Sequence, residues 1–297
     1  MKRGDTRRVA AVYNPTSGGG HFRKDVPLIV ESLRGFGMTV EEFATEGPGH
    51  ATYLARRAVT QGFDLVCCIG GDGTVNEAIN GVAETDVPLA IIPTGTVNVL
   101  ALELGIPLEP PDACRLLAEG DVSWIDLGRA GDRYFALMAG VGMDAAVIAS
   151  MNPVLKRTLH EAAFIVQGVA TYLTREEPLL RIETSERTVE GYFAVFGNAS
   201  NYGGIVGITP LADMRDGLLD VCVLTDKSFL STAWYWLAAL VNSHTSHPKV
   251  EYFRTEAAHV SVVEGEGEVL VQTDGEVAGQ LPLDCCIVPR SLRVVIP

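Results

Sequence analysis

The sequence has no apolar run long enough to cross a membrane. Its longest run, residues 229–241, falls short of the ~20 residues that a spanning helix needs, and Ser231 and Thr232 interrupt it. The charged start of the chain leads into a strand-like segment and not into the apolar core of a signal peptide. These absences predict a cytoplasmic protein.

Cysteine is scarce, and its placement argues against a disulfide framework. Two of the six cysteines form the adjacent pair Cys67-Cys68, and two more form Cys285-Cys286, both within apolar strand-like runs. Neighbouring residues on a strand point to opposite faces of the sheet. The cysteines are therefore expected to be small core residues in a reducing compartment, and not a metal site.

Positive charge is also in short supply. The 297 residues carry a formal net charge of −14, and no basic tract offsets the acidic excess. This balance argues against nucleic acid as a partner. Any contact with an anionic membrane has to be local, through clusters such as Arg3, Arg7 and Arg8 or Lys156 and Arg157.

Glycine, in contrast, is concentrated in one informative stretch. Gly70-Gly71-Asp72-Gly73-Thr74 follows an apolar strand-like run and leads into residues with helical spacing. The three glycines allow positive φ and a close approach of the backbone to a ligand, and the helix start offers N–H groups to an anion. A tight turn would explain the glycines alone. Because Asp72 would repel phosphate unless a metal mediates, the stretch predicts a nucleotide with a divalent cation.

The first part of the chain alternates strands and helices. Strands are predicted at residues 9–13, 38–44, 63–68 and 87–92, with helices around 28–36, 51–61, 78–82 and 99–104. This alternation predicts a parallel sheet with helices on both faces. Ligands bind beyond the carboxyl ends of such strands, and the loops that leave those ends are residues 14–20, 45–50, 70–74 and 93–98.

The pattern changes after residues 124–127. Strands are predicted at residues 133–139, 180–184, 189–196, 218–224, 259–263, 269–272, 285–289 and 292–296, with a hairpin at 265–267 and helices at 145–174 and 229–243. A mostly antiparallel β-sandwich follows from this pattern. The expected domains are residues 1–126 and 127–297, with the option that the last residues return to the first domain.

Three common nucleotide motifs are missing or incomplete. No glycine loop ends in Lys followed by Ser or Thr, and the protein-kinase motifs are absent. Residues 140–145 match the dinucleotide pattern GxGxxA. However, no second strand ending in an acidic residue follows at the required distance. This segment therefore does not predict NAD binding.

The motifs taken together resemble the diacylglycerol kinase catalytic-domain family, which includes sphingosine kinases and bacterial soluble lipid kinases. Besides the Gly70 to Glu77 stretch, the matching segments run along most of the chain. They are Asn14-Pro15-Thr16-Ser17-Gly18, Thr45 with Gly49-His50-Ala51, Pro93-Thr94-Gly95-Thr96-Val97-Asn98, Gly140-Val141-Gly142-Met143-Asp144, Asn198 with Tyr202-Gly203-Gly204, Pro210 with Asp213 and Asp216 to Asp220, and Thr273-Asp274-Gly275-Glu276. NAD kinases share the GGDG turn and the two-domain plan, but they lack the PxGTxN loop and the YGG and DGxLD segments.

The resemblance implies an α/β nucleotide domain followed by a β-sandwich, with the active site in the cleft between them. It also implies ATP-dependent, Mg²⁺-dependent phosphorylation of a lipid hydroxyl, of diacylglycerol or a related lipid. NAD kinase and a non-catalytic nucleotide- or lipid-binding relative are the alternatives. The catalytic residues implied are Asp72, Glu276 and Asp126. The sequence leaves the general base open, although Asp72 assisted by Glu276 is favoured, with Asp126 supporting the metal.

Simpler structural roles remain open for two of these acids, a strand-end cap for Asp126 and a hairpin-turn carboxylate for Glu276. The nucleotide-binding residues implied are Asn14, Pro15, Ser17, Gly18, Thr45, Gly70, Gly71, Gly73, Thr74, Glu77, Gly95, Thr96 and Asn98. A second Mg²⁺ is implied at Asp213, Asp216 and Leu218, where oxygen ligands gather, with a metal-free acidic turn as the alternative.

The lipid has to come from a membrane surface, so the protein is expected at the inner face of the membrane when it acts. Lys156, Arg157 and Arg175 with Trp234-Tyr235-Trp236 are candidates for that contact. Core packing is the favoured interpretation of the three aromatics. The oligomeric state stays open, with a homodimer as one possibility.

Overall fold

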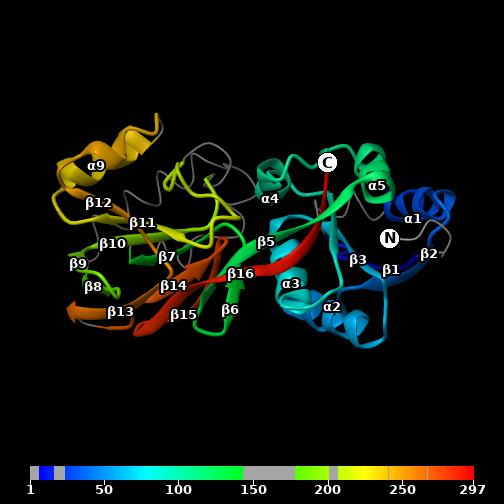
Figure 1. Ribbon diagram of the computed structural model, residues 1–297, viewed down its shortest axis with the longest axis horizontal. Helices are drawn as coiled ribbons and strands as arrows, with labels where there is room; N and C mark the ends of the chain where they lie inside the picture. Colours follow the sequence, from blue (N-terminus) through cyan, green and yellow to red (C-terminus); the bar gives the residue numbers. More distant parts are fainter. Residues whose placement is uncertain (1–6, 17–23, 143–177, 201–206, 240, 266) are drawn as a thin grey trace. The chain divides into compact units, whose positions relative to one another are not determined.

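The computed structural model describes residues 7–16, 24–142, 178–200, 207–239, 241–265 and 267–297. The helix predicted at 145–174 lies outside the described residues. The chain forms two compact units, one of residues Met1–Leu127 with Pro289–Pro297 and one of residues Gly128–Val288 (Figure 1). None of the described helices is long and apolar enough to span a membrane.

A parallel sheet forms the centre of the first unit. Its strands are β1 (Arg8–Tyr13), β2 (Thr39–Ala44), β3 (Leu65–Gly70) and β4 (Leu89–Pro93), in the order β2-β1-β3-β4. All three pairings are parallel. The last part of β16 (Leu283–Ile296) extends this sheet through a parallel pairing of Val294 with Leu89.

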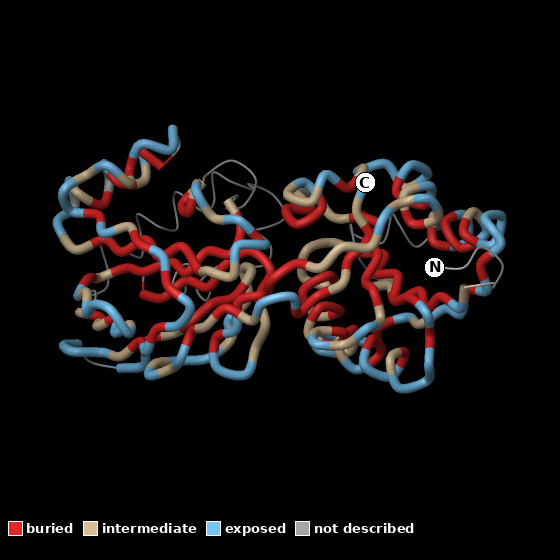
Figure 2. Tube along the Cα trace, in the orientation of Figure 1, coloured by how far each residue is buried: buried red, intermediate tan, exposed pale blue. Residues whose placement is uncertain are grey.

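Helices cover both faces of this sheet, as predicted. They are α1 (Val26–Gly35), α2 (His50–Thr60), α3 (Asp72–Val82), α4 (Val99–Glu103) and α5 (Pro110–Glu119). Helices α1 and α5 pack together over one face, where a core cluster includes Val9, Leu33, Cys67 and Leu117 (Figure 2). Helices α2 and α3 pack against each other so closely that a Cβ on Gly81 would lie 2.6 Å from the Ala55 side chain.

The second unit is an antiparallel β-sandwich. One sheet has the order β12-β11-β10-β7-β14-β15 and contains β7 (Met138–Gly142), β10 (Phe193–Gly197), β11 (Leu219–Leu224), β12 (Val250–Thr255), β14 (Leu270–Thr273) and β15 (Glu276–Gln280). The other contains the first part of β16 with β13 (Ala257–Glu264), β8 (Leu179–Glu183) and β9 (Thr188–Gly191), and β5 (Asp121–Ala130) pairs with β16 and with β6 (Arg133–Phe135). Side chains from both sheets, such as Phe196 and Val260, share one core.

The structure corrects several details of the sequence prediction. Residues 133–139 and 189–196, each predicted as one strand, hold two strands each, β6 with β7 and β9 with β10. The expected hairpin at residues 265–267 is wrong, because β13 pairs with β8 and β16 while β14 belongs to the other sheet. The two strands predicted at 285–289 and 292–296 are one strand, β16, which passes through Arg290 at a φ of 49°. Strands β12 and β15 were not predicted. Charged residues interrupt the apolar pattern of β12, and β15 is too short and too poor in apolar residues to give one.

The prediction that the cysteines are small core residues is confirmed for five of the six, and Cys286 is only partly buried. All six cysteines are free, and five of them are buried. Cys67 lies in the core cluster beneath α1 and α5, and Cys285 in the core of the sandwich.

Candidate active site

The four loops predicted to bind the nucleotide leave the same edge of the first sheet. Tyr13 at the end of β1 pairs with Ala44 at the end of β2 and with Ile69 near the end of β3. Gly70 pairs with Pro93 at the end of β4. Because β2 and β3 flank β1 on opposite sides, the strand order reverses there, which is where α/β sheets bind ligands.

The two glycine loops touch through their backbones. A Cβ on Gly95 would lie 2.7 Å from the Gly71 Cα, and a Cβ on Gly71 would lie 3.1 Å from the Gly95 Cα. A Cβ on Gly70 would lie 2.7 Å from Cβ of Thr74. Positive φ is not the reason for these glycines, because Gly70, Gly71 and Gly73 are absent from the positive-φ residues of the described chain, and that expectation is wrong. Close backbone approach is the reason at Gly71, and the Thr74 side chain leaves no room for a Cβ at Gly70.

Asp72 joins these two loops. It is the first residue of α3 and not a loop residue, and its carboxylate accepts hydrogen bonds from the backbone N–H of Asn98 at 3.0 Å and of Val99 at 2.7 Å. Burial raises the pKa of the Asp72 carboxyl, and the backbone donors offset part of that rise. The carboxylate therefore caps the start of α4 as well as standing at the start of α3.

Asn98 shapes its own loop. Its side-chain Oδ1 accepts from the Gly95 N–H at 2.9 Å, and its Nδ2 donates to the Gly95 carbonyl at 2.9 Å. Its backbone is left-handed, with a φ of 57°, a conformation that asparagine tolerates better than most residues. The side chain of Asn98 thus closes its own loop.

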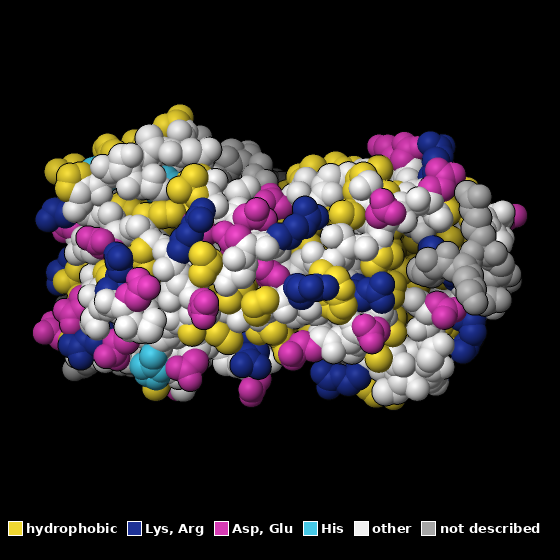
Figure 3. Space-filling model, in the orientation of Figure 1, with side chains coloured by type: hydrophobic (Ala, Val, Ile, Leu, Met, Phe, Trp, Pro, Cys, Tyr) yellow, Lys and Arg dark blue, Asp and Glu magenta, His cyan; other side chains and the backbone are white. Residues whose placement is uncertain are grey.

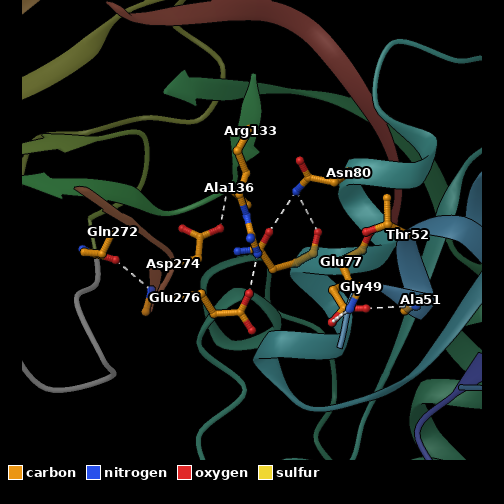
Figure 4. A network of polar contacts seen from close by, with 12 residues as sticks. Gly49, Ala51, Thr52, Glu77, Asn80, Arg133, Ala136, Gln272, Asp274 and Glu276 are labelled. Atoms are coloured by element: carbon orange, nitrogen blue, oxygen red, sulfur yellow. Dashed lines mark hydrogen bonds and ion pairs between the residues drawn. The ribbon is translucent and has the colours of Figure 1, made fainter. Parts of the chain in front are cut away.

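Glu77 caps α2. Its two carboxylate oxygens accept from the Gly49 N–H at 2.8 Å and the Ala51 N–H at 2.9 Å, and its carbonyl accepts from the Thr52 hydroxyl (Figure 4). These bonds occupy two N–H groups at the start of α2 that would otherwise be available to an anion. In this structure, Glu77 fixes the shape of the second loop.

The remaining predicted nucleotide residues lie in the same loops or in the first turn of α3. Asn14 accepts hydrogen bonds from the Thr16 N–H and hydroxyl through its Oδ1, at 2.9 and 2.8 Å. Thr45 is buried, and its N–H donates to the Tyr13 carbonyl. Pro15, Gly73, Thr74 and Thr96 complete the set. Ser17 and Gly18 lie outside the described residues.

Asp126 is a buried residue of β5, exposed to 3%. Its Oδ1 accepts from the Arg290 N–H at 2.7 Å. The Arg290 and Arg293 guanidinium groups both lie within 6 Å of the Trp124 ring, at 5.9 and 5.6 Å. Asp126 therefore anchors the bend of β16 in the first unit.

Glu276 lies in the second unit, directly after the turn that joins β14 to β15. Asp274 and Gly275 form this turn with φ values of 48° and 84°, as a type I′ hairpin requires. The Glu276 carboxylate forms an ion pair with the Arg133 guanidinium, and Figure 4 shows the two side chains facing each other.

Asp274 binds the link between β6 and β7. Its carboxylate accepts from three consecutive backbone N–H groups, those of Ala136 at 2.8 Å and of Leu137 and Met138 at 2.9 Å (Figure 4). Asn198 donates to the Ala136 carbonyl at 2.8 Å, and its own N–H donates to the Leu137 carbonyl. The side chains of Asp274 and Asn198 thus position the segment that leads into β7.

Asp274, Asn198 and Arg133 were not predicted as site residues. Asp274 and Asn198 stand inside matched motifs, and that position was the available signal. Arg133 carries no such signal, because it is separated from Glu276 by 143 positions.

The Asp213, Asp216 and Leu218 segment forms a hydrogen-bonded acidic turn. Asp213 accepts from the Arg215 N–H and Asp216 from the Leu218 N–H, each at 3.0 Å. The other oxygen of Asp216 lies 3.7 Å from the Arg254 guanidinium. Among the described residues, no group of three or more His, Cys, Asp or Glu could hold a metal ion.

Comparison with protein-family models also gives two parts, although the second match includes the residues after 288 that belong to the first unit of the structure. Residues 8–130 match the diacylglycerol kinase catalytic domain, and residues 137–296 match the YegS C-terminal NAD kinase beta sandwich-like domain. A diacylglycerol kinase of Staphylococcus aureus (strain bovine RF122 / ET3-1) is 30% identical over 295 residues, covering 98% of this chain and 93% of that protein. A diacylglycerol kinase of Staphylococcus saprophyticus is also 30% identical, with 98% and 96% covered.

Solved structures show the same fold. A putative diacylglycerol kinase from Bacillus anthracis str. Sterne superposes with a TM-score of 0.81 at 22% identity, covering 99% of both chains. A second structure of such a protein from the same organism gives a TM-score of 0.80 at 24% identity, covering 98% of this chain and 97% of the other. The glycine loops with Asp72 lie within the first family match, and the Asp274 turn lies within the second. The chain therefore belongs to the diacylglycerol kinase catalytic-domain family.

Proposed function

We propose that this protein is an ATP-dependent lipid kinase that transfers the γ-phosphoryl group of ATP to a hydroxyl of diacylglycerol or a related lipid. The family implies ATP use, and the relatives that are 30% identical are named diacylglycerol kinases. One observation carries the proposal. The glycine loops after β3 and β4 touch at Gly71 and Gly95, and Asp72 joins them at the sheet edge where nucleotides bind.

The nucleotide would lie against these loops. The first turn of α3 carries N–H groups that the helix's own hydrogen bonds do not use, and these suit a phosphate. The start of α2 suits it less, because Glu77 occupies the Gly49 and Ala51 N–H groups. We therefore assign phosphate binding to the residues around Gly73 and Thr74, and loop-shaping roles to Glu77 and Asn98.

The reaction asks for positioning, charge neutralisation and one proton transfer. The lipid hydroxyl oxygen forms a bond to the γ-phosphorus, the bond from that phosphorus to the β–γ bridging oxygen breaks, and the hydroxyl proton passes to a carboxylate. We propose Asp72 for this proton, with Glu276 assisting and Asp126 in a supporting position. That these three residues, from two units, form one cluster is part of the proposal.

Mg²⁺ is proposed as the metal that accompanies ATP. In phosphotransferases it is held by one or two carboxylates together with substrate phosphates and water. Asp72 fits this role, because each of its oxygens has one backbone donor and a carboxylate oxygen offers two lone pairs. When bound, the ion would neutralise phosphate charge.

A second Mg²⁺ at Asp213, Asp216 and Leu218 stays a proposal. It would need backbone and water oxygens besides the two carboxylates, and Arg254 already lies beside one of them. Action at the inner face of the membrane and assembly as a homodimer are likewise proposals.

The test is a kinase assay with the purified full-length protein, γ-labelled ATP, Mg²⁺ and a panel of lipids that includes diacylglycerol, sphingosine and monoacylglycerol. NAD is added in a parallel reaction. Labelled phosphatidic acid from diacylglycerol is the expected product. ATP binding without a phosphorylated product from any lipid would refute the proposal, and formation of NADP would assign the protein to NAD kinase chemistry.

A further inference from the structure

Helix α9 (Phe229–Ala239) exposes an apolar stripe that the fold of the second unit does not use. Leu230 is 80% exposed, Trp234 38%, Leu237 68% and Val241 72%. The spacing of four, three and four residues places these side chains along one side of the helix and the turn that follows it. Leucine, valine and tryptophan rarely stand together at such exposure without a partner.

The opposite side of α9 already accounts for the packing of the helix. Tyr235 is fully buried among Phe193, Cys222 and His244, and Trp236 packs against Phe193 at 5.9 Å between ring centroids. Core packing is thus the role of these two aromatics, as predicted. Trp234 differs from them, because it stacks on His247 at 4.0 Å and remains partly exposed.

The stripe is free of charge and has polar ends. Phe229–Ala239 contains no charged residue. At its start, Asp226 accepts hydrogen bonds from the Ser228 and Ser231 hydroxyls. In Figure 3, the region where Figure 1 shows α9 has hydrophobic side chains mixed with white atoms. Exposed apolar side chains that gather around a tryptophan are typical of a surface that contacts a membrane or another partner.

The size of the stripe favours a membrane over a second protein. At the observed exposures the four side chains present roughly 400 Å² of apolar surface, which is comparable to the largest patch on a typical monomer. A stable protein interface buries about 800 Å² from each partner. Reversible binding to a bilayer has no such area requirement, because a single acyl chain already gives marginal, reversible binding.

We propose that the Leu230, Trp234, Leu237 and Val241 stripe of α9 inserts into the surface of the bilayer that holds the lipid substrate. This inference rests on the proposed lipid kinase function. Because the protein has a net charge of −14, the contact depends on apolar insertion and not on attraction to anionic lipids. Binding is therefore expected on neutral vesicles and to persist at high salt, where screening removes exposed charge attraction.

The experiment compares the full-length wild type with L230S/L237S and with the control L28S. Leu28 is 64% exposed on α1, outside the stripe, so L28S makes the same chemical change elsewhere. Flotation measures binding to neutral phosphatidylcholine vesicles that contain diacylglycerol, in low and high salt. Kinase activity is measured with diacylglycerol in these vesicles and with a water-soluble short-chain diacylglycerol. Sedimentation measures the mass in solution.

The expected result is a fall of at least about tenfold in vesicle binding for L230S/L237S, since two exposed leucine side chains no longer transfer into the apolar phase. Activity on vesicular diacylglycerol falls with it, whereas activity on the short-chain substrate is retained. L28S behaves as the wild type. Melting temperatures show whether each variant is folded. If L230S/L237S does not fold, the single variant L237A is compared with the wild type instead.

Unchanged vesicle binding of L230S/L237S would overturn the inference, as would wild-type binding that high salt abolishes. A wild-type dimer that becomes monomeric in L230S/L237S with vesicle binding intact would assign the stripe to a second copy instead. Failure of the proposed function looks different. If vesicle binding depends on the stripe but the protein phosphorylates neither substrate, the membrane-binding inference holds and the proposed lipid kinase function is refuted.

Discussion

Replacing Asp72 by asparagine tests both the structure and the chemistry of the candidate site. The Asp72 carboxylate accepts two backbone N–H groups, but the asparagine side chain has only one acceptor oxygen. One N–H would then face an NH₂ group, at a cost of about 1–3 kcal/mol. Burial disfavours the charged form of the Asp72 carboxyl and raises its pKa. Asparagine is neutral and avoids this penalty, which offsets part of the cost. A net loss of about 1–2 kcal/mol is expected, or a few degrees in melting temperature.

The expected loss of turnover is much larger. A positioned base or metal ligand contributes about 10²–10⁴ in rate, which corresponds to roughly 3–5 kcal/mol of barrier. A protein stable by ~5–15 kcal/mol stays folded after losing 1–2 kcal/mol, so unfolding cannot account for such a loss. ATP binding should persist, as measured by calorimetry.

Asp64 provides the matched control for this variant. Asp64 is exposed and accepts the Arg8 N–H at 2.7 Å, outside the carboxyl-end loops. D64N should therefore lose some stability and keep its turnover. If D72N retains near-normal turnover, or if D64N loses as much as D72N, the role assigned to Asp72 is wrong.

Two further predictions concern stability. His244 is fully buried with Nε2 bonded to the Ile208 carbonyl, and burial lowers its pKa from the ordinary value near 6.5. The folded state therefore holds the His244 ring neutral, and its contribution to stability is fully present above the unfolded pKa of ~6.5. As the pH falls below that value, towards the lower pKa of the folded state, this contribution is lost. Between pH 7.5 and 5.5 the melting temperature of the wild type should fall more than that of H244Q, and equal falls would contradict the assignment. G95A should cost about 1–3 kcal/mol by overpacking against Gly71, measured by denaturant unfolding. G35A, where a Cβ meets nothing within 4 Å, should be neutral or slightly stabilising, and equal effects of the two would contradict the loop contact.

Local patterns were sufficient for much of the fold. The apolar strands β1, β3 and β4 and the loops after them could be predicted because buried parallel strands are continuous apolar runs. The prediction of a second, antiparallel domain came from a change in that pattern. The family resemblance added the activity and the site residues, which no periodicity carries.

The partners of the functional side chains could not be predicted. Asp72 and Glu77 each bind backbone groups more than twenty positions away, and such pairs are set by tertiary packing. Both carboxylates were predicted to serve a ligand, whereas in the structure each also caps a helix. The hairpin at residues 265–267 was predicted from its glycines, although the same residues can link strands of two different sheets.

The composition of the first unit has a consequence for biosynthesis. Val294 pairs with Leu89 beside β4, Val295 belongs to the core beneath α1 and α5, and Arg293 donates to the Asp86 carbonyl. The first unit therefore needs residues 289–297 to complete its sheet, although its other residues are synthesised first. Domains usually fold in the order in which they leave the ribosome. Here the second unit, which is continuous in sequence, can finish folding before the first unit, whose sheet stays open at β4 until synthesis passes residue 294.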